Sequence, residues 1–546
     1  MTSRSLGHRA PLLWLVLPEA AGLAAGRVTA PVPVPWLLAG AVMFALLAVA
    51  AARRRPFAWA MALAGALALA GWASYALHRP RLADWDRLPP RELRLALRVF
   101  RVFPQADARK TTGLALVTKA GSRWRELSGQ RVYFSLLLPR GQPAPMRSAE
   151  IDAVGILAPA PRDSVAGSFD RYLDDAGVNF RFARGRLLAV EHPPTRYRAF
   201  CERLAARLET ILGLGIAGKR PDLTAIYRAM MLGQKHELSD EQDALFLRSG
   251  TLHLFAINGL HIGVVAVALA ALLAALRCPR PAVALVTLGV LWLDVDTTGA
   301  SPSAVRAFLL VACHELAPVL RRPANGLASL SLAALLVLTL DPLALFSASF
   351  QMSYGVVAVI LAFGLPLGEK LEAAGKPFRD LPTVTWPRWR HWVAGGSRWL
   401  AGALGLGTAA TLVSAITGAT FFQVFTPAAL AMNLVLMPLA SLVIIAGFAS
   451  IVTGLTGAVV PSILFNHAAA LVLAVIDRFV RLGAGIPGAW WAVEWRAGWI
   501  APVTYATLLA VVFAGYAGGW RGKFGGFWPP FVVAALALIA GVRFAS

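Results

Sequence analysis

The stretch VVAVALAALLAAL, Val264–Leu276, carries no charged residue, and similar runs occur at Leu327–Leu340 and Phe531–Ala540. An apolar helix of about 20 residues spans the hydrocarbon core of a bilayer, and each of these runs continues into further apolar residues. Of the 546 residues, 57% are hydrophobic and only 15% are charged, whereas soluble proteins average about 25% charged. The sequence therefore predicts a polytopic α-helical membrane protein and excludes a soluble globular protein.

About 13 segments have the length and apolar character of membrane-spanning helices. They are residues 11–27, 35–52, 56–77, 250–276, 281–297, 303–320, 324–340, 344–367, 398–419, 426–453, 461–482, 498–518 and 527–543. The first three form an N-terminal domain, 1–78, and the others form a C-terminal domain, 249–546. Loops rich in Lys and Arg stay in the cytoplasm. The Arg triplet at 53–55 and the basic loop 369–398 therefore predict a cytoplasmic N-terminus.

Residues 79–198 form one long polar region whose periodicity is that of β-strands. Apolar and polar residues alternate through Leu93–Val99, the pattern of a half-buried strand. Comparable runs, separated by Gly, Pro and Ser, occur at 112–119, 131–138, 150–157 and 179–190. Five short strands predict a small all-β barrel of the OB type, although a β-sandwich shares this pattern. Because the third span ends near His78, we expect this domain on the outer side of the membrane.

The polar region is also basic. The whole chain has a formal net charge of +23, and the positive-inside rule accounts for much of that excess. Within 79–198, however, Lys and Arg outnumber Asp and Glu by almost two to one, on the side where that rule predicts no excess. The same alternation of spans places Asp294, Asp296 and Asp341 on the outer side. A basic outer domain is suited to binding a polyanion.

Residues 199–248 predict helices that lie along the outer interface rather than across the membrane. Phe200–Leu214 is amphipathic, and Leu223–Leu232 forms a second helical pattern. Ser239, followed by Gln242, predicts a capped short helix at 240–248.

Polar residues inside apolar spans are costly and are functional candidates for that reason. The densest group is GTLHLFAINGLHIG, Gly250–Gly263, which contains His253, Asn258, Gly259 and His261. The two histidines lie eight residues apart, close to two helical turns, and Gly259 can break the helix between them. The alternative is helix packing, in which Asn and His bridge neighbouring helices and Gly permits close approach.

Three further residues are pore or translocation candidates. Arg306 follows Pro302 near the outer end of a span, where free backbone N–H groups and a fixed positive charge suit a phosphate. The alternative is an arginine that extends to the interface. Gln351 and Asn433 lie in spans with several small or polar residues, an arrangement that packing alone also explains.

Enzyme signatures are absent from the sequence. There is no HExxH, GxSxG or Walker A motif, and the cysteines Cys201, Cys278 and Cys313 form no CxxC pair. We therefore expect no catalytic residues, no metal site and no cofactor. A membrane-embedded hydrolase built on His253 and His261 is the alternative that this expectation opposes.

The stretch His253-Leu-Phe-Ala-Ile-Asn-Gly-Leu-His261 resembles the HLxAISGLH signature of the ComEC competence proteins. Further elements similar to that family follow its order across about 220–440. They are Met231–Ser239, Gly299 to Arg306-Ala307, Asp341-Pro342 with Phe350–Tyr354, and Thr426-Pro427 to Asn433 and Pro438. The chain departs from the family at Asn258, where Ser is usual, and at Gln234, where Asp is common.

The resemblance implies a channel that passes single-stranded DNA across the bacterial inner membrane during natural transformation, with an external OB-fold that handles incoming DNA. It implies membrane lipids, a DNA-delivery protein and a cytoplasmic motor as partners, and leaves the oligomeric state open. Many members continue into a metallo-β-lactamase-like domain, whereas this sequence ends at Ser546, so we expect a separate nuclease. The rival interpretations are a transporter of a small anion or lipid-linked sugar, and a divergent member without a competence role.

An OB-fold that binds a single strand uses a basic groove and stacked aromatic side chains. The DNA-binding candidates are Arg94, Arg98, Arg123, Arg125, Arg131, Arg181 and Arg184. The stacking candidates are Trp124, Tyr133, Phe134, Phe180 and Phe182, although alternating aromatic residues in a barrel more often form its core.

Overall fold

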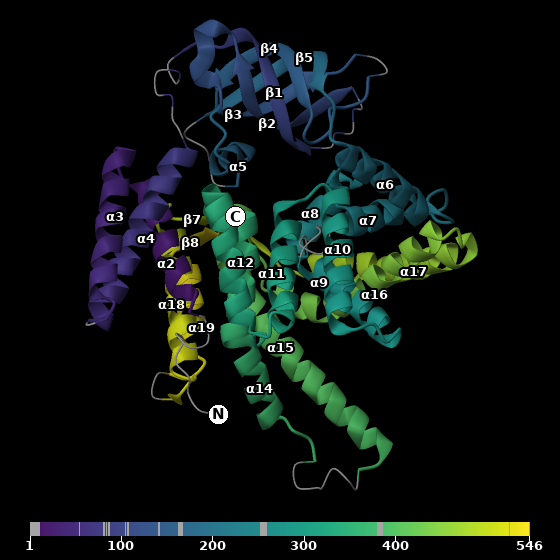
Figure 1. Cartoon of the computed structure of the whole chain (residues 1–546). Coiled ribbons are helices and arrows are strands. Elements are labelled where there is room, and N and C mark those ends of the chain that lie inside the picture. The colour runs from purple at the N-terminus through teal and green to yellow at the C-terminus, as the bar shows by residue number, and fades with distance from the viewer. Residues whose placement is uncertain are drawn as a thin grey trace.

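Five strands between residues 91 and 192 close into a barrel in the computed structural model of the chain (Figure 1). They are β1 (Arg91–Phe103), β2 (Lys110–Ala120), β3 (Arg131–Leu137), β4 (Glu150–Pro159) and β5 (Phe180–His192). The order around the barrel is β1-β2-β3-β5-β4, with β3 and β5 parallel and the other pairs antiparallel. The five predicted strands are confirmed, and the closed barrel is consistent with an OB-like fold.

The structure describes residues 11–544 except 54, 80–81, 83–84, 86–87, 104, 106, 108, 140–141, 162–166, 252–258, 379–385 and 523–524, and except the side chain of Lys235.

Period-2 alternation builds the interior of the barrel. Leu95, Leu97 and Val99 point inward from β1 and are almost completely buried. Phe134, Phe180 and Phe182 are buried in the same core, so these stacking candidates pack the barrel. Trp124, in the 3-10 helix η2 (Ser122–Leu127), and Tyr133 remain partly exposed. The short helix α5 (Phe169–Asp175), between β4 and β5, was not predicted.

Helices occupy the places of all the predicted spans. They are α2 (Leu13–Val28), α3 (Val34–Ala51), α4 (Pro56–His78), α9 (Gly259–Ala275), α10 (Arg280–Thr297), α11 (Pro302–Val319), α12 (Gly326–Leu340), α13 (Ala348–Val359), α14 (Leu365–Ala374), α15 (Arg388–Phe421), α16 (Ala429–Leu455), α17 (Val459–Ala484), α18 (Ile500–Ala517) and α19 (Pro529–Ala540). Within the described ranges, 7 helices are long and apolar enough to cross a membrane. The π-helix η6 (Ile360–Gly364) joins α13 and α14 into one of these. The architecture fits a polytopic membrane protein, and the number of spans stays a prediction.

Three shorter helices connect the barrel to the large helical domain. They are α6 (Arg196–Gly213), α7 (Pro221–Leu232) and α8 (Asp240–Arg248). The predicted cap of α8 is confirmed, because the Ser239 side chain accepts a hydrogen bond from the Gln242 backbone and the Gln242 side chain accepts one from the Ser239 backbone. The 3-10 helix η3 (Lys235–Glu237) precedes α8.

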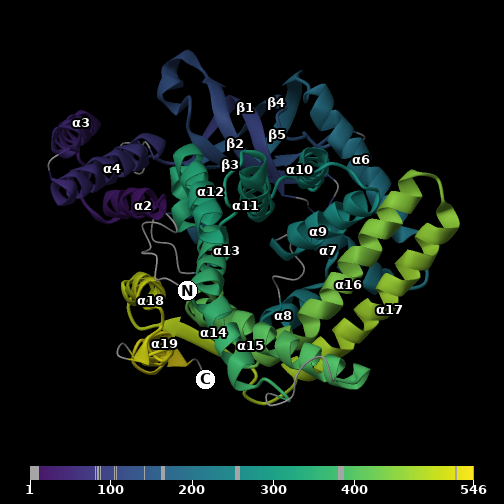
Figure 2. The same cartoon turned by 60° about the horizontal axis from the view of Figure 1, so that its bottom comes forward.

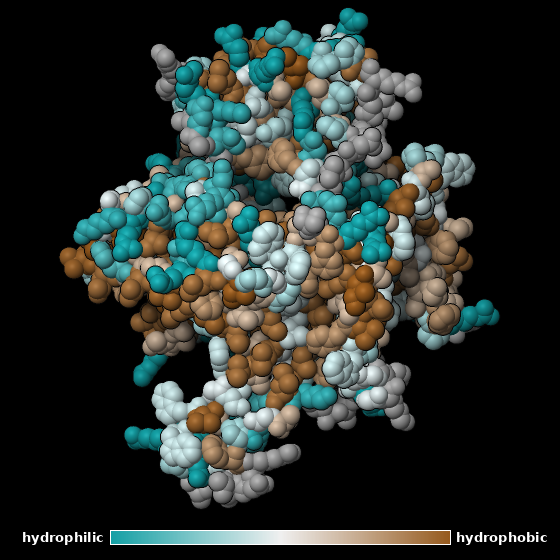
Figure 3. Space-filling view, turned by 180° about the vertical axis from the view of Figure 1, so that it is seen from behind, coloured by the Kyte–Doolittle hydropathy of each residue, from teal (hydrophilic) through white to brown (hydrophobic). Residues whose placement is uncertain are grey.

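The barrel lies over one end of the helices, and α14 with part of α15 extends from the opposite end (Figure 1). Seen from behind, hydrophobic residues gather over the middle of the helical body. Hydrophilic residues cover much of the barrel and its boundary with the helices (Figure 3). An apolar belt between two polar ends is the distribution expected of a protein that sits in a bilayer.

Helices from distant parts of the chain form a ring. In Figure 2, α9, α11, α13, α15 and α16 follow one another around a centre. Each packs against the next, and α16 returns to pack against α9. The residues buried between α9 and α16 belong to the largest hydrophobic core of the chain.

Two small features connect the remaining segments, and neither was predicted. The 3-10 helix η5 (Pro342–Phe346) links α12 to α13. A three-stranded sheet of β6 (Val424–Phe425), β7 (Trp491–Trp495) and β8 (Val542–Phe544) ties the end of α15 to the C-terminal segment.

Candidate nucleic-acid interface

The barrel is attached to the helical domain through charged groups around α5. Arg27, at the end of α2, donates a 2.7 Å hydrogen bond from Nη2 to Oδ1 of Asp175. Arg79, after α4, bonds both the carboxylate and the backbone carbonyl of Asp174, the latter at 2.9 Å. Burial raises the pKa of Asp175 above its ordinary value, and the charges of Arg27 and Arg171 oppose that rise. These bonds hold the α5 side of the barrel against the helices.

A second attachment lies at the start of β3. Arg131 donates from Nη1 to the carbonyl of Ala176 at 2.9 Å, and its Nη2 lies 3.5 Å from Oδ1 of Asp341. Gly177 has φ +73°, and a Cβ there would lie 2.4 Å from Cδ1 of Leu343 in η5. A side chain at residue 177 would therefore require Leu343 to shift at the contact between the barrel and the helical domain. Arg131, a DNA-binding candidate, takes part in docking.

Four arginines meet where the barrel approaches α10 and α11. Arg101 lies in β1, Arg147 precedes β4, Arg198 lies in α6 and Arg306 lies in α11. Electrostatic interaction couples Arg147 to Arg101 and Arg198, and couples Arg306 to Arg101. Within the described part of the chain, Asp296 is the one carboxylate that forms an ion pair with any of the four. We call these four arginines and Asp296 the junction cluster.

The bonds inside the junction cluster leave its positive charge in excess. Oδ1 of Asp296 accepts hydrogen bonds from Nη1 of Arg198 at 2.6 Å and from Nη1 of Arg147 at 3.4 Å. Arg101 donates to the hydroxyl of Tyr172 in α5 at 2.7 Å. Burial lowers the pKa of Arg147, and repulsion from Arg198 adds to this effect, although the attraction of Asp296 opposes it. The cluster therefore contains four guanidinium groups and one carboxylate, which bonds two of them.

Arg306 is the most deeply buried member of the junction cluster, at 3% exposure. Its Nη2 donates to Oγ of Ser349 in α13, and its Nε is buried with no hydrogen-bond partner among the described residues. A buried cation that lacks a paired anion is costly. Phosphate oxygens accept strong charge-assisted bonds from guanidinium groups. The chemistry of the site therefore suits an anion.

The polar group around residues 250–263 lies only partly in the described structure. The candidates His253 and Asn258 fall outside the described residues, and Gly259 is the first residue of α9. His261 is buried, and its Nε2 lies 3.5 Å from Oδ2 of Asp294 in α10. His261 of α9 thus contacts α10, the helix that also carries Asp296.

The other two pore candidates lie on further helices of the ring. Gln351 in α13 donates from Nε2 to the carbonyl of Leu345 at 3.2 Å. Oδ1 of Asn433 in α16 is buried, and no hydrogen-bond partner for it occurs in the part of the chain that the structure describes. Together with His261 and Arg306, these residues place one candidate each on α9, α11, α13 and α16. The structure assigns all four to the ring, and their role in translocation stays a prediction.

We call β4, β5 and the first part of β1, Arg91–Arg98, the outer strands of the barrel, and their arginines are balanced differently. Nε of Arg94 donates to Asp152 at 2.7 Å, and Nε of Arg98 donates to Glu150 at 2.7 Å. Arg181 forms an ion pair with Asp170. The exposed candidates on this domain also include Arg123, Arg125 and Arg184. Arg123 lies 5.3 Å from the ring centroid of Trp124. Three of the seven DNA-binding candidates thus already have a carboxylate partner on the barrel itself.

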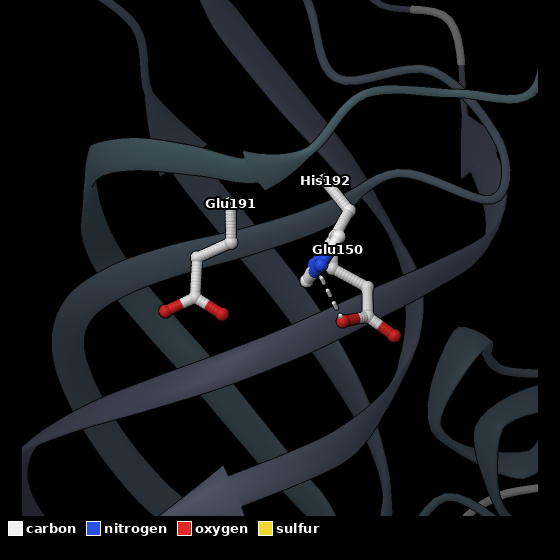
Figure 4. A group of neighbouring side chains, drawn as sticks. All are labelled: Glu150, Glu191 and His192. Atoms are coloured by element: carbon white, nitrogen blue, oxygen red, sulfur yellow. Dashed lines mark ion pairs between the residues drawn. The ribbon is translucent and has the colours of Figure 1, made fainter.

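One group of potential metal ligands occurs in the described residues, at the ends of β4 and β5. Glu150, Glu191 and His192 have ligand atoms within 4.8 Å of one another. Figure 4 shows the His192 ring directed at Glu150, with 3.2 Å between Nδ1 and Oε2. Glu150 also accepts from Arg98, whose bond lowers the pKa of the carboxyl. A guanidinium at this position repels a cation, so these contacts constitute a surface ion-pair network.

Sequence reasoning singled out Arg306 but missed its partners. Arg101, Arg147 and Arg198 looked like ordinary members of a basic region, and Asp296 served only to mark the outer side. Their approach depends on how the barrel docks, which no local pattern encodes. The excess of basic residues in 79–198 was the available signal, but it did not distinguish paired from unpaired arginines.

Comparisons with known proteins bear on the helical domain. The family described as "Competence protein" matches residues 230–517, which include α9, α11, α13 and α16 and exclude the barrel. "ComE operon protein 3" of Bacillus subtilis (strain 168) is 26% identical over 207 residues, which cover 38% of this chain. The matched part spans 26% of the length of that relative. No solved structure matches the chain.

Proposed function

Because the chain belongs to the Competence protein family, we propose that it is the channel through which one strand of DNA crosses the bacterial inner membrane during natural transformation. Family membership supports a role in DNA uptake for competence. The single-strand channel is a finer proposal, which depends on the chemistry of the chain itself.

The junction cluster is the observation that carries this proposal. A single strand presents a phosphate at every nucleotide, and bare phosphates do not enter hydrocarbon. Conduction therefore requires cationic groups at the entrance and a wet, polar path beyond them. The junction cluster supplies the cationic groups between the barrel and the ring. His261, Gln351 and Asn433 supply polar groups on the ring helices.

The proposed path has three stages. The strand first meets the barrel, where the exposed Arg123, Arg125 and Arg184 are available for electrostatic contact. It then passes the junction cluster, where Arg306 bonds a phosphate oxygen. It finally passes through the ring of α9, α11, α13, α15 and α16. His253 and Asn258 would act in this last stage with His261 to shape the pore.

The proposal requires a membrane orientation and partners. About 13 spans, with the N-terminus in the cytoplasm, place the barrel on the outer side, where DNA arrives. The sequence contains no Walker A motif, so a cytoplasmic motor must supply the driving force. A DNA-delivery protein and a separate nuclease would present the single strand, and membrane lipids surround the channel. We propose no catalytic role and no cofactor for this chain.

A small-anion transporter is the alternative that the junction cluster itself favours, since buried guanidinium groups also suit phosphate or sulfate. Purified full-length protein distinguishes the two functions. A DNA channel should bind single-stranded oligonucleotides with an affinity that falls steeply with salt. A small-anion transporter should bind inorganic phosphate equally well and gain nothing from chain length.

The direct test is uptake of labelled duplex DNA by a deletion strain of a naturally competent host. We expect the label that is protected from external nuclease to disappear from the cytoplasm, while DNA still reaches the outer compartment. Re-expression of the wild-type chain should restore it, and a chain with Arg306→Gln is the matched comparison. Unchanged cytoplasmic label in the deletion strain would refute the channel and leave the anion transporter as the leading function.

A further inference from the structure

Asp296 occupies an unusual place for a carboxylate. Its side chain is only 1% exposed, and it lies in the last turn of α10, which ends at Thr297. The carbonyl groups at a helix C-terminus carry partial negative charge and disfavour an anion. Burial disfavours it further. The carboxylate must therefore be stabilised by groups outside its own helix.

The stabilising groups are two arginines from different parts of the molecule. Arg147 comes from the barrel, and Arg198 comes from α6. Both bond the same oxygen, Oδ1, and the carboxylate also interacts with the Tyr197 hydroxyl at the start of α6. One carboxylate oxygen thus holds two guanidinium groups together across the junction.

A carboxylate and a phosphodiester make the same kind of bond to arginine. We propose that Asp296 is an internal substitute for a DNA phosphate. It holds Arg147 and Arg198 in the resting protein and releases them to the backbone of an incoming strand. This inference rests on the proposed function and adds a residue that governs which anions can engage the site.

The arrangement selects for a polyanion by competition. A small anion that displaces Asp296 from Arg147 and Arg198 gains two bonds but leaves a buried carboxylate unpaired, so little net affinity results. A strand engages Arg101 and Arg306 through neighbouring phosphates at the same time. These additional contacts offset the cost of displacing Asp296, as in other multivalent binding. Displacement also breaks a bridge between the barrel and the helices, so binding loosens this contact.

The test is the Asp296→Asn variant of the full-length protein in detergent, with a fluorescent oligothymidylate as the probe. Without the competing carboxylate, we expect about tenfold tighter binding than wild type at the same salt concentration, the equivalent of one charge-assisted hydrogen bond. Asp152→Asn is the matched control, because it makes the same charge change and frees Arg94 on the outer strands. It should change the affinity less than about twofold, because the Arg94 side chain is exposed to solvent and salt screens its charge.

The melting temperature is a second measurement. It distinguishes the proposed role of Asp296 from a purely structural role. In chloride, Asp296→Asn should melt below wild type, because four guanidinium groups then repel one another. The oligonucleotide should raise the melting temperature of the variant more than that of wild type, since a ligand stabilises according to its affinity. If the variant gives too little protein, Asp296→Ser also removes the carboxylate and is measured in its place.

The outcomes separate this inference from the proposed function. Wild type that binds the oligonucleotide, together with a folded Asp296→Asn variant that binds it no more tightly, overturns the inference and leaves the channel in place. Failure of both proteins to bind overturns both proposals. Tighter binding of inorganic phosphate alone by the variant, with no preference for the oligonucleotide, would also overturn the inference and support the small-anion function.

Discussion

The outer strands of the barrel and the junction cluster are both rich in arginine, but they differ in how that charge is balanced. On the outer strands, Arg94 and Arg98 each have a carboxylate on the adjacent strand β4. In the junction cluster, Asp296 bonds Arg147 and Arg198, whereas Arg101 and Arg306 have no carboxylate partner among the described residues. Surface ion pairs of the first kind are nearly neutral to a distant polyanion. Under the proposed function, we therefore expect DNA to bind where charge is unbalanced, and the number of arginines alone does not indicate the site.

Loss of Arg306 should give the largest effect. Arg306→Gln removes the most buried cation of the junction cluster, and a bond between a charged donor and a phosphate contributes about 1.5–3 kcal/mol. We expect DNA uptake into the cytoplasm to fall at least about tenfold with unchanged protein abundance, as measured by nuclease-protected label. Ser349→Ala removes only the neighbouring hydroxyl and should have a small effect. Normal uptake by Arg306→Gln would remove Arg306 from the mechanism.

A triple variant tests the two arginines that Asp296 bonds. Arg147→Gln combined with Arg198→Gln and Asp296→Asn removes two cations without leaving a buried carboxylate unpaired. Each phosphate contact to a single strand contributes about 0.7 to the slope of log affinity against log salt, so the slope should fall by about 1.4. Titration of the full-length protein with oligothymidylate at several salt concentrations measures it. An unchanged slope would mean that these two arginines do not contact phosphate.

Loosening the barrel should weaken the junction cluster without changing any charge. Gly177→Ala introduces a Cβ 2.4 Å from Leu343 at a residue with φ +73°. Gly129→Ala is the matched control, since residue 129 has φ +84° but nothing within 4 Å of a Cβ there. Both variants bear a backbone cost of about 1 kcal/mol, yet only Gly177→Ala should reduce oligonucleotide affinity, by about threefold. Equal effects of the two variants would show that docking through Gly177 is irrelevant to binding.

The outer strands should give the smallest effect. Arg94→Gln combined with Arg98→Gln removes two positive charges that Asp152 and Glu150 already balance. We expect oligonucleotide affinity to change less than about twofold, in the same titration and with the same salt slope as wild type. A loss of affinity as large as that of the junction variant would contradict the proposed difference between the two regions. It would indicate that DNA binds the outer strands.

Local patterns were sufficient for the elements of this fold. The alternation in Leu93–Val99 predicted a strand, and the spacing of Ser239 and Gln242 predicted a capped helix, because both depend on residues close in sequence. The parallel pairing of β3 with β5 and the return of α16 to α9 were not predictable in this way. They join segments whose sequences carry no mark of their partner.

The candidate site was predictable only in part for the same reason. Arg306 could be singled out because a charge within an apolar span is visible in the sequence. Arg147 and Asp296 are separated by 148 intervening residues and lie in two different regions, the barrel and the helical domain. They come together only where the two regions meet. For Phe134 and Phe182, the alternating pattern was compatible with either a stacking surface or a core. In the closed barrel both side chains are buried in the core.

The closure of the ring by α16 has a consequence for biosynthesis. Val265 and Ala266 of α9 share a hydrophobic core with Leu436 and Ala440 of α16, yet helices α10 to α15 are made between them. At about 5–20 residues per second, a ribosome needs on the order of ten seconds or more to bridge that interval. The nascent chain therefore presents an open crescent to the surrounding lipid until translation reaches α16. We therefore expect the finished ring to be a late product of synthesis.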